Sequence, residues 1–182
     1  MKYEKDIILF ISQEIYEKMK SCVVKASPNE SFGLLIGPKP REIILEDSNE
    51  FQYHYNIDLF ECVESDKRSP VDFLMENIEE LYKIIKNAYE KYNRRVLSIF
   101  HSHPAGAYPS GFDIKYMKFL YKFYNNVLNS SVTVKTAIKN QIWTIMDSSD
   151  FKLNGFIYLE KQVQQIQLVI NLDKENSELE KN

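Results

Sequence analysis

The chain has 182 residues, a formal net charge of −3 and 44% hydrophobic residues, which together predict a globular protein large enough for one domain with a full core. Its 23 Lys and Arg are mixed with 26 Asp and Glu, and no basic face predicts nucleic-acid binding. No apolar run approaches the roughly 18 residues needed to cross a bilayer. We therefore expect a soluble, cytoplasmic protein that binds neither nucleic acid nor a membrane.

The first third of the chain predicts one helix among several strands. Residues 6–11, apolar after Asp6, predict a first strand, after which Ser12 caps a helix that extends to about Ala26. Apolar residues recur at helical spacing in this helix and predict one buried face, formed by Ile15, Met19, Cys22, Val23 and Ala26. Apolar or alternating patterns then predict strands at 30–37, 42–45 and 51–55.

Histidine and cysteine often act as metal ligands or catalytic groups, but we assign no such role to those in this part of the chain. His54 lies in an alternating strand without an acidic or histidine neighbour at a ligand spacing, so we interpret it as structural. Cys22 and Cys62 form neither a zinc-ligand spacing nor a disulfide framework. Cys22 is expected in the core, and thiol catalysis is not expected.

The middle of the chain predicts a loop and then a helix. Residues 56–72 lack periodicity and are rich in acids, which predicts a solvated loop. Residues 74–92 carry the clearest helical pattern, with an apolar stripe that we assign to core packing: Ile78, Leu81, Ile85, Ala88 and Tyr92.

A candidate metal site follows. The run from Arg95 to Phe100 predicts a buried strand that ends at His101 and His103. Residues i and i+2 of an extended chain point to the same side, so both imidazoles can reach one ion. A helix capped by Ser110 and extending to about Asn126 places Asp113 in its first turn. Catalytic zinc uses three nitrogen or oxygen ligands and leaves a fourth position to water.

Each feature also has a simpler interpretation. A His-x-His pair at a strand end is commonly an ordinary surface or core pair, and Ser-x-x-Asp is itself a helix-capping pattern. Glu30, taken alone, is a solvated carboxylate at a strand start. Their occurrence together favours a zinc site. Further strand patterns at 132–138, 141–146, 151–160 and 163–172 complete an α/β chain in which both long helices can pack on a mixed sheet.

The sequence resembles the JAMM (MPN+) family of zinc isopeptidases in three motifs: Glu-x-x-Gly-x-Leu-x-Gly at 30–37, His-Ser-His-Pro at 101–104 and Ser-x-x-Asp at 110–113. The resemblance covers about residues 1–150. It implies a prokaryotic single-domain member with the α/β MPN (JAMM) fold, a mixed β-sheet packed between helices as in cytidine deaminases. Residues 1–172 would form the domain, and 173–182 a charged, disordered tail.

The resemblance also implies the roles of five residues. Glu30 would be the general base for the zinc-bound water, and Ser110 would stabilise the oxyanion. One Zn²⁺ per chain would be bound by His101, His103 and Asp113. Six residues separate His103 from Ser110, one fewer than the usual spacing of the family.

The implied reaction is zinc-dependent, deubiquitinase-like hydrolysis of the isopeptide bond between the Gly-Gly C-terminus of a ubiquitin-like protein and a lysine of its target. Conjugates of ubiquitin or a ubiquitin-like modifier would be the substrates. The protein could act as a homodimer or in a larger complex. In that family an insertion near 56–72 contacts the substrate tail, often by adding a strand. A non-catalytic MPN scaffold and a zinc hydrolase of another amide or ester are the alternatives.

Overall fold

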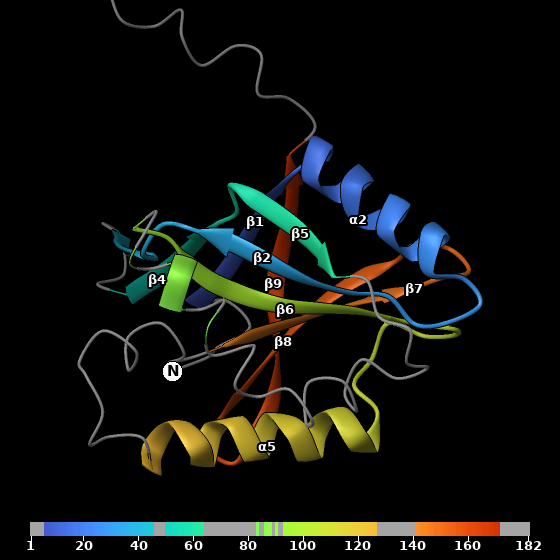
Figure 1. Cartoon of the computed structure of the whole chain (residues 1–182). Coiled ribbons are helices and arrows are strands. Elements are labelled where there is room, and N and C mark those ends of the chain that lie inside the picture. The colour runs from blue at the N-terminus through green and yellow to red at the C-terminus, as the bar shows by residue number, and fades with distance from the viewer. Residues whose placement is uncertain are drawn as a thin grey trace, which may run out of the picture.

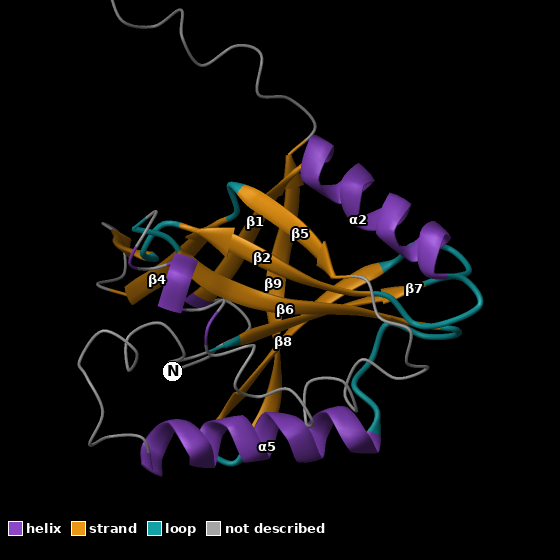
Figure 2. Ribbon diagram, viewed as in Figure 1, coloured by secondary structure: helices purple, strands orange, loops and turns teal. Residues whose placement is uncertain are grey.

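The computed structural model describes residues 6–45, 50–63, 83, 86–88, 90, 93–126 and 141–171. Figure 1 shows a central sheet with a helix on either side, and Figure 2 shows the same view by secondary structure. The helices are α2 (Gln13–Ala26) and α5 (Gly111–Asn126). The strands are β1 (Ile7–Ser12), β2 (Phe32–Gly37), β3 (Arg41–Leu45), β4 (Glu50–Asn56), β5 (Leu59–Val63), β6 (Arg95–His103), β7 (Ile142–Asp147), β8 (Leu153–Leu159) and β9 (Gln162–Asn171).

The described strands form one mixed sheet in the order β3-β4-β1-β9-β8-β7-β6-β2-β5. Strand β1 is parallel to β4 and β9, and β6 is parallel to β7. The other neighbouring pairs are antiparallel. The expected α/β fold with a mixed sheet is therefore confirmed.

The two faces of the sheet pack against different helices, as β2 illustrates. Phe32 and Leu34 belong to a core cluster that includes Met117 of α5. Leu35, which points the other way, belongs to a second cluster with Met19 of α2. Because side chains alternate along a strand, one fully buried strand serves both helices.

The two glycines of β2 have a steric reason. A Cβ at Gly33 would collide with the ring of Phe60 on β5 and would lie 2.8 Å from the carbonyl oxygen of Glu61. A Cβ at Gly37 would collide with the carbonyl oxygen of Asn56. The Gly-x-Leu-x-Gly part of the motif thus lets neighbouring chain segments approach β2 closely.

Several predicted elements match the structure. Helix α2 begins after Ser12, whose side chain accepts a hydrogen bond from the Ile15 N–H at 3.3 Å. His54 packs against Phe10 with ring centroids 4.9 Å apart and lies 3.2 Å from the Gln52 amide oxygen, as expected of a structural residue. The predicted strand at 132–138, most of the predicted helix at 74–92 and the tail at 173–182 lie outside the described residues.

Two expectations need correction. The segment 56–72 is not all loop, because Leu59–Val63 forms β5, which pairs antiparallel with β2. Its acidic residues hid the strand: Glu61 is exposed on β5, which has β2 as its one sheet neighbour among the described strands. The other concerns the helix at 110–126, whose apolar stripe we expected at Ile114, Met117, Tyr121, Tyr124 and Leu128; of these Met117 is buried and Tyr121 is not. The buried residues of this helix are Asp113, Tyr116, Met117 and Leu120, whereas Tyr121 is 39% exposed.

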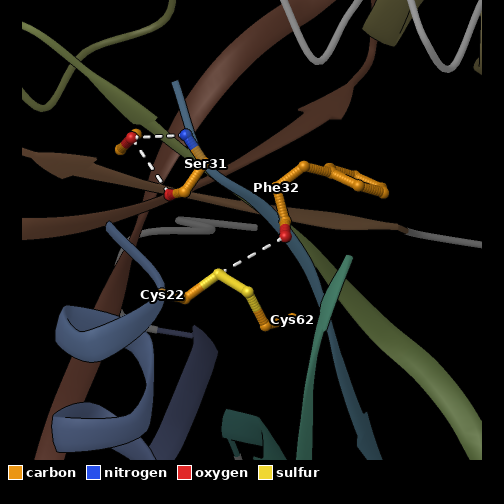
Figure 3. Close-up of a disulfide and its surroundings, with 5 residues drawn as sticks. Cys22, Ser31, Phe32 and Cys62 are labelled. Atoms are coloured by element: carbon orange, nitrogen blue, oxygen red, sulfur yellow. Dashed lines mark hydrogen bonds between the residues drawn. A yellow bond between two sulfur atoms is a disulfide. The ribbon is translucent and has the colours of Figure 1, made fainter. Parts of the chain in front are cut away.

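The cysteine expectation was wrong, because Cys22 and Cys62 form a disulfide with a Cα–Cα distance of 5.9 Å. It joins α2 to β5, and Cys22 Sγ lies 3.6 Å from the carbonyl oxygen of Phe32 (Figure 3). The two cysteines are 40 residues apart in sequence. Only the pairing of β5 with β2 brings them together, so their spacing could not reveal the bond.

Candidate metal centre

A β-bulge in β6 determines which side chains of this strand face α5. The pairing with β2 moves from Leu35 opposite Ser98 to Ile36 opposite Val96, so Leu97 is the extra residue. Beyond the bulge, Ile99 packs in the α5 cluster and Phe100 in the α2 cluster. By alternation, His101 and His103 point to the α5 side.

Helix α5 brings Asp113 to the same place. Asp113 lies in the first turn, and its spacing from Tyr116, Met117 and Leu120 puts it on the buried face. Its N–H donates to Ser110 Oγ at 3.2 Å, and the Ser110 N–H donates to Asp113 Oδ2 at 2.6 Å. This reciprocal capping pair begins the helix and orients the carboxylate.

The three side chains converge on one point. His101 Nε2 lies 3.2 Å from Asp113 Oδ1, and His103 Nε2 lies 3.2 Å from Asp113 Oδ2. The two Nε2 atoms are 3.0 Å apart. Tetrahedral zinc with bonds of about 2.0–2.2 Å separates neighbouring ligand atoms by about 3.3–3.6 Å. Outward shifts of a few tenths of an ångström would therefore admit an ion, and this donor set could hold one.

The electrostatics of the site suit a cation. Burial raises the pKa of Asp113, but hydrogen bonds from His101 and His103 outweigh it and hold that pKa well below its usual range. Burial lowers the pKa of His103, but its hydrogen bond to Asp113, the charge of Asp113 and the charge of Glu30 together raise it above the ordinary value. Asp113 is 1% exposed, and its buried negative charge favours a positive charge beside it.

Glu30 lies beside this group. In the antiparallel pair of β2 and β6, Phe32 is opposite His101, and continuing the register by two residues puts Glu30 opposite His103. Glu30 also falls on the α5 side by alternation with Phe32. Its carboxylate is close enough to raise the pKa of His103. The structure therefore brings Glu30 near the three converging side chains, while Ser110 stays exposed at the start of α5.

Sequence reasoning missed residues that support the site. Ser31, labelled in Figure 3, and Ser102 are hydrogen-bonded to each other, and they join the segment after Glu30 to the segment between the two histidines. Trp143 of β7 packs edge-on against His101, with ring centroids 6.0 Å apart. Ser31 and Ser102 do belong to the two motifs, but their contact becomes evident only from the strand register.

Comparison with known proteins identifies the family. A family model of prokaryotic homologs of the JAB domain matches residues 12–146. The chain belongs to this family. The JAB/MPN family includes JAMM isopeptidases and also non-catalytic members. The match extends over both histidines, Asp113 and Glu30, so the group described above lies inside the family domain.

A solved structure with a TM-score above 0.5 shows the same fold. A protein from Desulfitobacterium hafniense, known from its solution structure, is 19% identical with a TM-score of 0.59, over 94% of this chain and 97% of that one. A JAB1/MPN domain protein from Archaeoglobus fulgidus is 13% identical with a TM-score of 0.44, over 87% of this chain and 97% of that one. A search of curated proteins finds no match. Neither described helix combines the length and apolar character that a bilayer crossing requires.

Proposed function

We propose that this JAB-domain protein is a zinc-dependent isopeptidase that hydrolyses the bond between the Gly-Gly C-terminus of a ubiquitin-like protein and a lysine of its target. The observation that carries the proposal is the convergence of His101, His103 and Asp113 with Glu30 opposite His103. A scaffold needs neither a complete set of ligands nor an acid placed beside it. The His₂Asp donor set fits zinc, which favours nitrogen and oxygen ligands in catalytic sites.

Zinc, when bound, supplies a Lewis acid that polarises the amide carbonyl and lowers the pKa of water toward 7. The protein's own residues do the rest. Glu30 accepts the proton from the attacking water and delivers it to the departing lysine amine, a step typically worth roughly 10²–10⁴-fold in rate. Asp113 stays ionised beside the two imidazoles, because its pKa is far below neutrality.

Ser110 acts on the oxygen of the scissile carbonyl. Its Oγ accepts the hydrogen bond from the Asp113 N–H, which leaves the hydroxyl proton for donation to another oxygen. Negative charge develops on the carbonyl oxygen during attack, and a donor placed there is typically worth about 10²–10³-fold in rate. The same serine therefore caps α5 and supports the reaction.

The modifier tail binds along β5 in this proposal. Strand β5 has one sheet neighbour, β2, in the described part of the chain, so its outer edge is open to an extended peptide. Leu59 and Glu61 are exposed on this strand. Glu61 is exposed on β5 and would meet a basic tail. Glu64 and Asp66 follow it in the sequence and lie outside the described residues. Exchanging these three for Ser should weaken binding of the modifier, and unchanged affinity would remove this part of the proposal.

The decisive experiment compares wild type with Glu30→Gln on a ubiquitin-like protein joined through its Gly-Gly terminus to a lysine. We expect the wild type to contain one zinc and to cleave, a chelator to stop cleavage, and Glu30→Gln to keep zinc and lose turnover. An inactive wild type that holds zinc would favour the scaffold. Cleavage of a small amide or ester alone would favour another zinc hydrolase, and a wild type that binds no zinc would remove the proposal.

A further inference from the structure

The loop between His103 and Ser110 is fastened to the hairpin that joins β7 to β8. The Ser148 N–H donates to the carbonyl oxygen of His103 at 2.9 Å. The Gly106 N–H donates to Asp147 Oδ2 at 2.6 Å, and Asn154 Nδ2 donates to the carbonyl oxygen of Ala107 at 2.9 Å. One loop is thus held at three successive points along its course.

Two of these three fastenings use side chains because the strand ladder ends there. His103 and Asp147 are the last paired residues of β6 and β7. Past them the loop leaves the sheet, and its buried backbone groups need other partners. Ala107 is 2% exposed and Asn154 9% exposed, so their hydrogen bond lies in the interior. Gly106 has φ +84°, a left-handed conformation that favours glycine and lets its N–H reach Asp147.

Asp147 is itself held in place. Its Oδ1 accepts hydrogen bonds from Ser149 Oγ at 2.6 Å and from the Ser149 N–H at 2.8 Å. Oδ2 is thereby aimed at Gly106. The hydrogen bonds from the Ser149 side chain and backbone, and then from Gly106, lower the pKa of Asp147. The loop contact is therefore a charge-assisted hydrogen bond, which is stronger than a bond between neutral groups.

We propose that Asp147 and Asn154 are positioning residues that fix the course of the 104–109 loop and so set where Asp113 meets His101 and His103. This inference rests on the proposed zinc site. The loop has six residues and joins one ligand to the helix that carries another. Such a short loop has little slack, so its path decides the distance between the ligands. Groups that hydrogen-bond a metal ligand directly typically contribute about 10–100-fold in metal affinity. Asp147 and Asn154 act one step further away, on the loop backbone, so we expect an effect near the lower end of that range.

The test is the Zn²⁺ affinity of the full chain, measured by competition with a chromophoric chelator. Asp147→Ala and Asn154→Leu should each bind Zn²⁺ roughly tenfold more weakly than wild type, the lower end of the range for groups that contact a ligand directly. Asp150→Ala is the matched control, because Asp150 lies in the same hairpin but does not contact the loop. Among the described residues, its side chain accepts a hydrogen bond from the Lys152 N–H, at 2.8 Å. That variant should bind Zn²⁺ like wild type.

Two further readouts separate positioning from general destabilisation. Cobalt-substituted Asp147→Ala should show an altered visible absorption spectrum, because the geometry of the site changes, whereas Asp150→Ala should not. In the metal-free protein, the Gly106 amide should exchange with solvent faster in Asp147→Ala than in the control. Should Asp147→Ala fail to fold, Asp147→Asn, which keeps an acceptor oxygen, replaces it and should show a smaller loss of affinity.

The outcomes distinguish this inference from the proposed function. If wild type binds Zn²⁺ and the Asp147 and Asn154 variants bind it equally well, with unchanged cobalt spectra, the positioning role is overturned and the zinc site stands. If wild type binds no Zn²⁺, both fail. Unchanged exchange of the Gly106 amide in Asp147→Ala would also overturn the role, with or without metal.

Discussion

The hydroxyl oxygen of Ser102 accepts two hydrogen bonds from Ser31, from its N–H at 2.9 Å and from its hydroxyl at 3.0 Å. The Ser102 N–H donates in return to the Ser31 carbonyl oxygen at 3.1 Å. Both residues are buried, at 2% and 1% exposed. Ser31 follows Glu30, and Ser102 stands between His101 and His103. The pair therefore fixes the segment that carries the proposed base against the segment that carries two proposed ligands.

Ser102→Ala should reduce turnover by roughly ten- to hundredfold while zinc stays bound. The substitution leaves the Ser31 N–H and hydroxyl without their partner, which costs about 1–3 kcal/mol of the free energy of unfolding. It also loosens Glu30, and small misplacements of a catalytic group cost up to about 10²-fold in rate. Denaturant unfolding, zinc content and turnover are the measurements.

The matched control is Ser98→Ala. Ser98 is also fully buried on β6, and its Oγ lies 3.2 Å from the Thr144 hydroxyl, but it lies four residues from Ser102. It should lose a similar amount of stability and keep its turnover per folded molecule. If both variants lose turnover equally, the Ser31–Ser102 contact has no special role in placing Glu30.

The strands and helices that could be predicted are those whose signal is local. A continuous apolar run predicted β1, the cap at Ser12 predicted the start of α2, and the apolar run to Phe100 predicted β6. The grouping of His101, His103 and Asp113 could be anticipated, because i and i+2 residues share a face and a helix cap fixes the direction of its first turn. The function of these residues stays a prediction.

Features that depend on sheet order could not be predicted. Strand β5 reads as acidic loop until β2 is seen beside it, and the Cys22–Cys62 bond follows from that same pairing. Asp147 and Asn154 carry no motif, since their partners are backbone groups of a loop some 40 residues earlier in the sequence. The periodicity of the sequence indicates which face of an element is apolar. It does not indicate which residues far apart in the sequence form hydrogen bonds.

Ser110→Ala should keep zinc and lose about 10²–10³-fold in turnover, because it removes the donor to the developing oxyanion. It also removes the acceptor for the Asp113 N–H, which should cost about 1 kcal/mol of stability. Ser12→Ala removes the cap of α2, whose Oγ accepts from the Ile15 N–H, and controls for loss of a helix cap. Turnover that falls equally in both variants would show that Ser110 acts only as a cap.

Zinc affinity should weaken as the pH falls, beginning above about 6.5, the ordinary pKa of histidine. Zinc binds neutral imidazole, and the pKa of His103 is raised, so protons compete at a higher pH than usual. Asp113 contributes nothing in this range, because its lowered pKa keeps it ionised.

The metal-free protein has the opposite dependence. Protonated His103 is stabilised by Asp113, so this contribution is fully present below the unfolded pKa and is lost as the pH rises through the raised folded pKa. Chelator competition and denaturant unfolding between about pH 5.5 and 8.5 measure both effects. His54→Gln should leave the pH dependence of zinc affinity unchanged, because His54 packs against Phe10 and is not part of the ligand group. Zinc affinity that weakens only below about pH 6.5 would contradict the raised pKa of His103.

Cys62→Ser should lower the free energy of unfolding by about 2–4 kcal/mol under oxidising conditions, because the bond to Cys22 closes a loop with a sequence separation of 40. Cys62 is exposed on β5, so a dithiol reductant can attack its sulfur and release the Cys22 thiolate. Reduced wild type should then unfold at the same denaturant concentration as Cys62→Ser, and the reductant should leave the variant unchanged. Wild type whose midpoint does not move on reduction would show that α2 and β5 are held by packing alone.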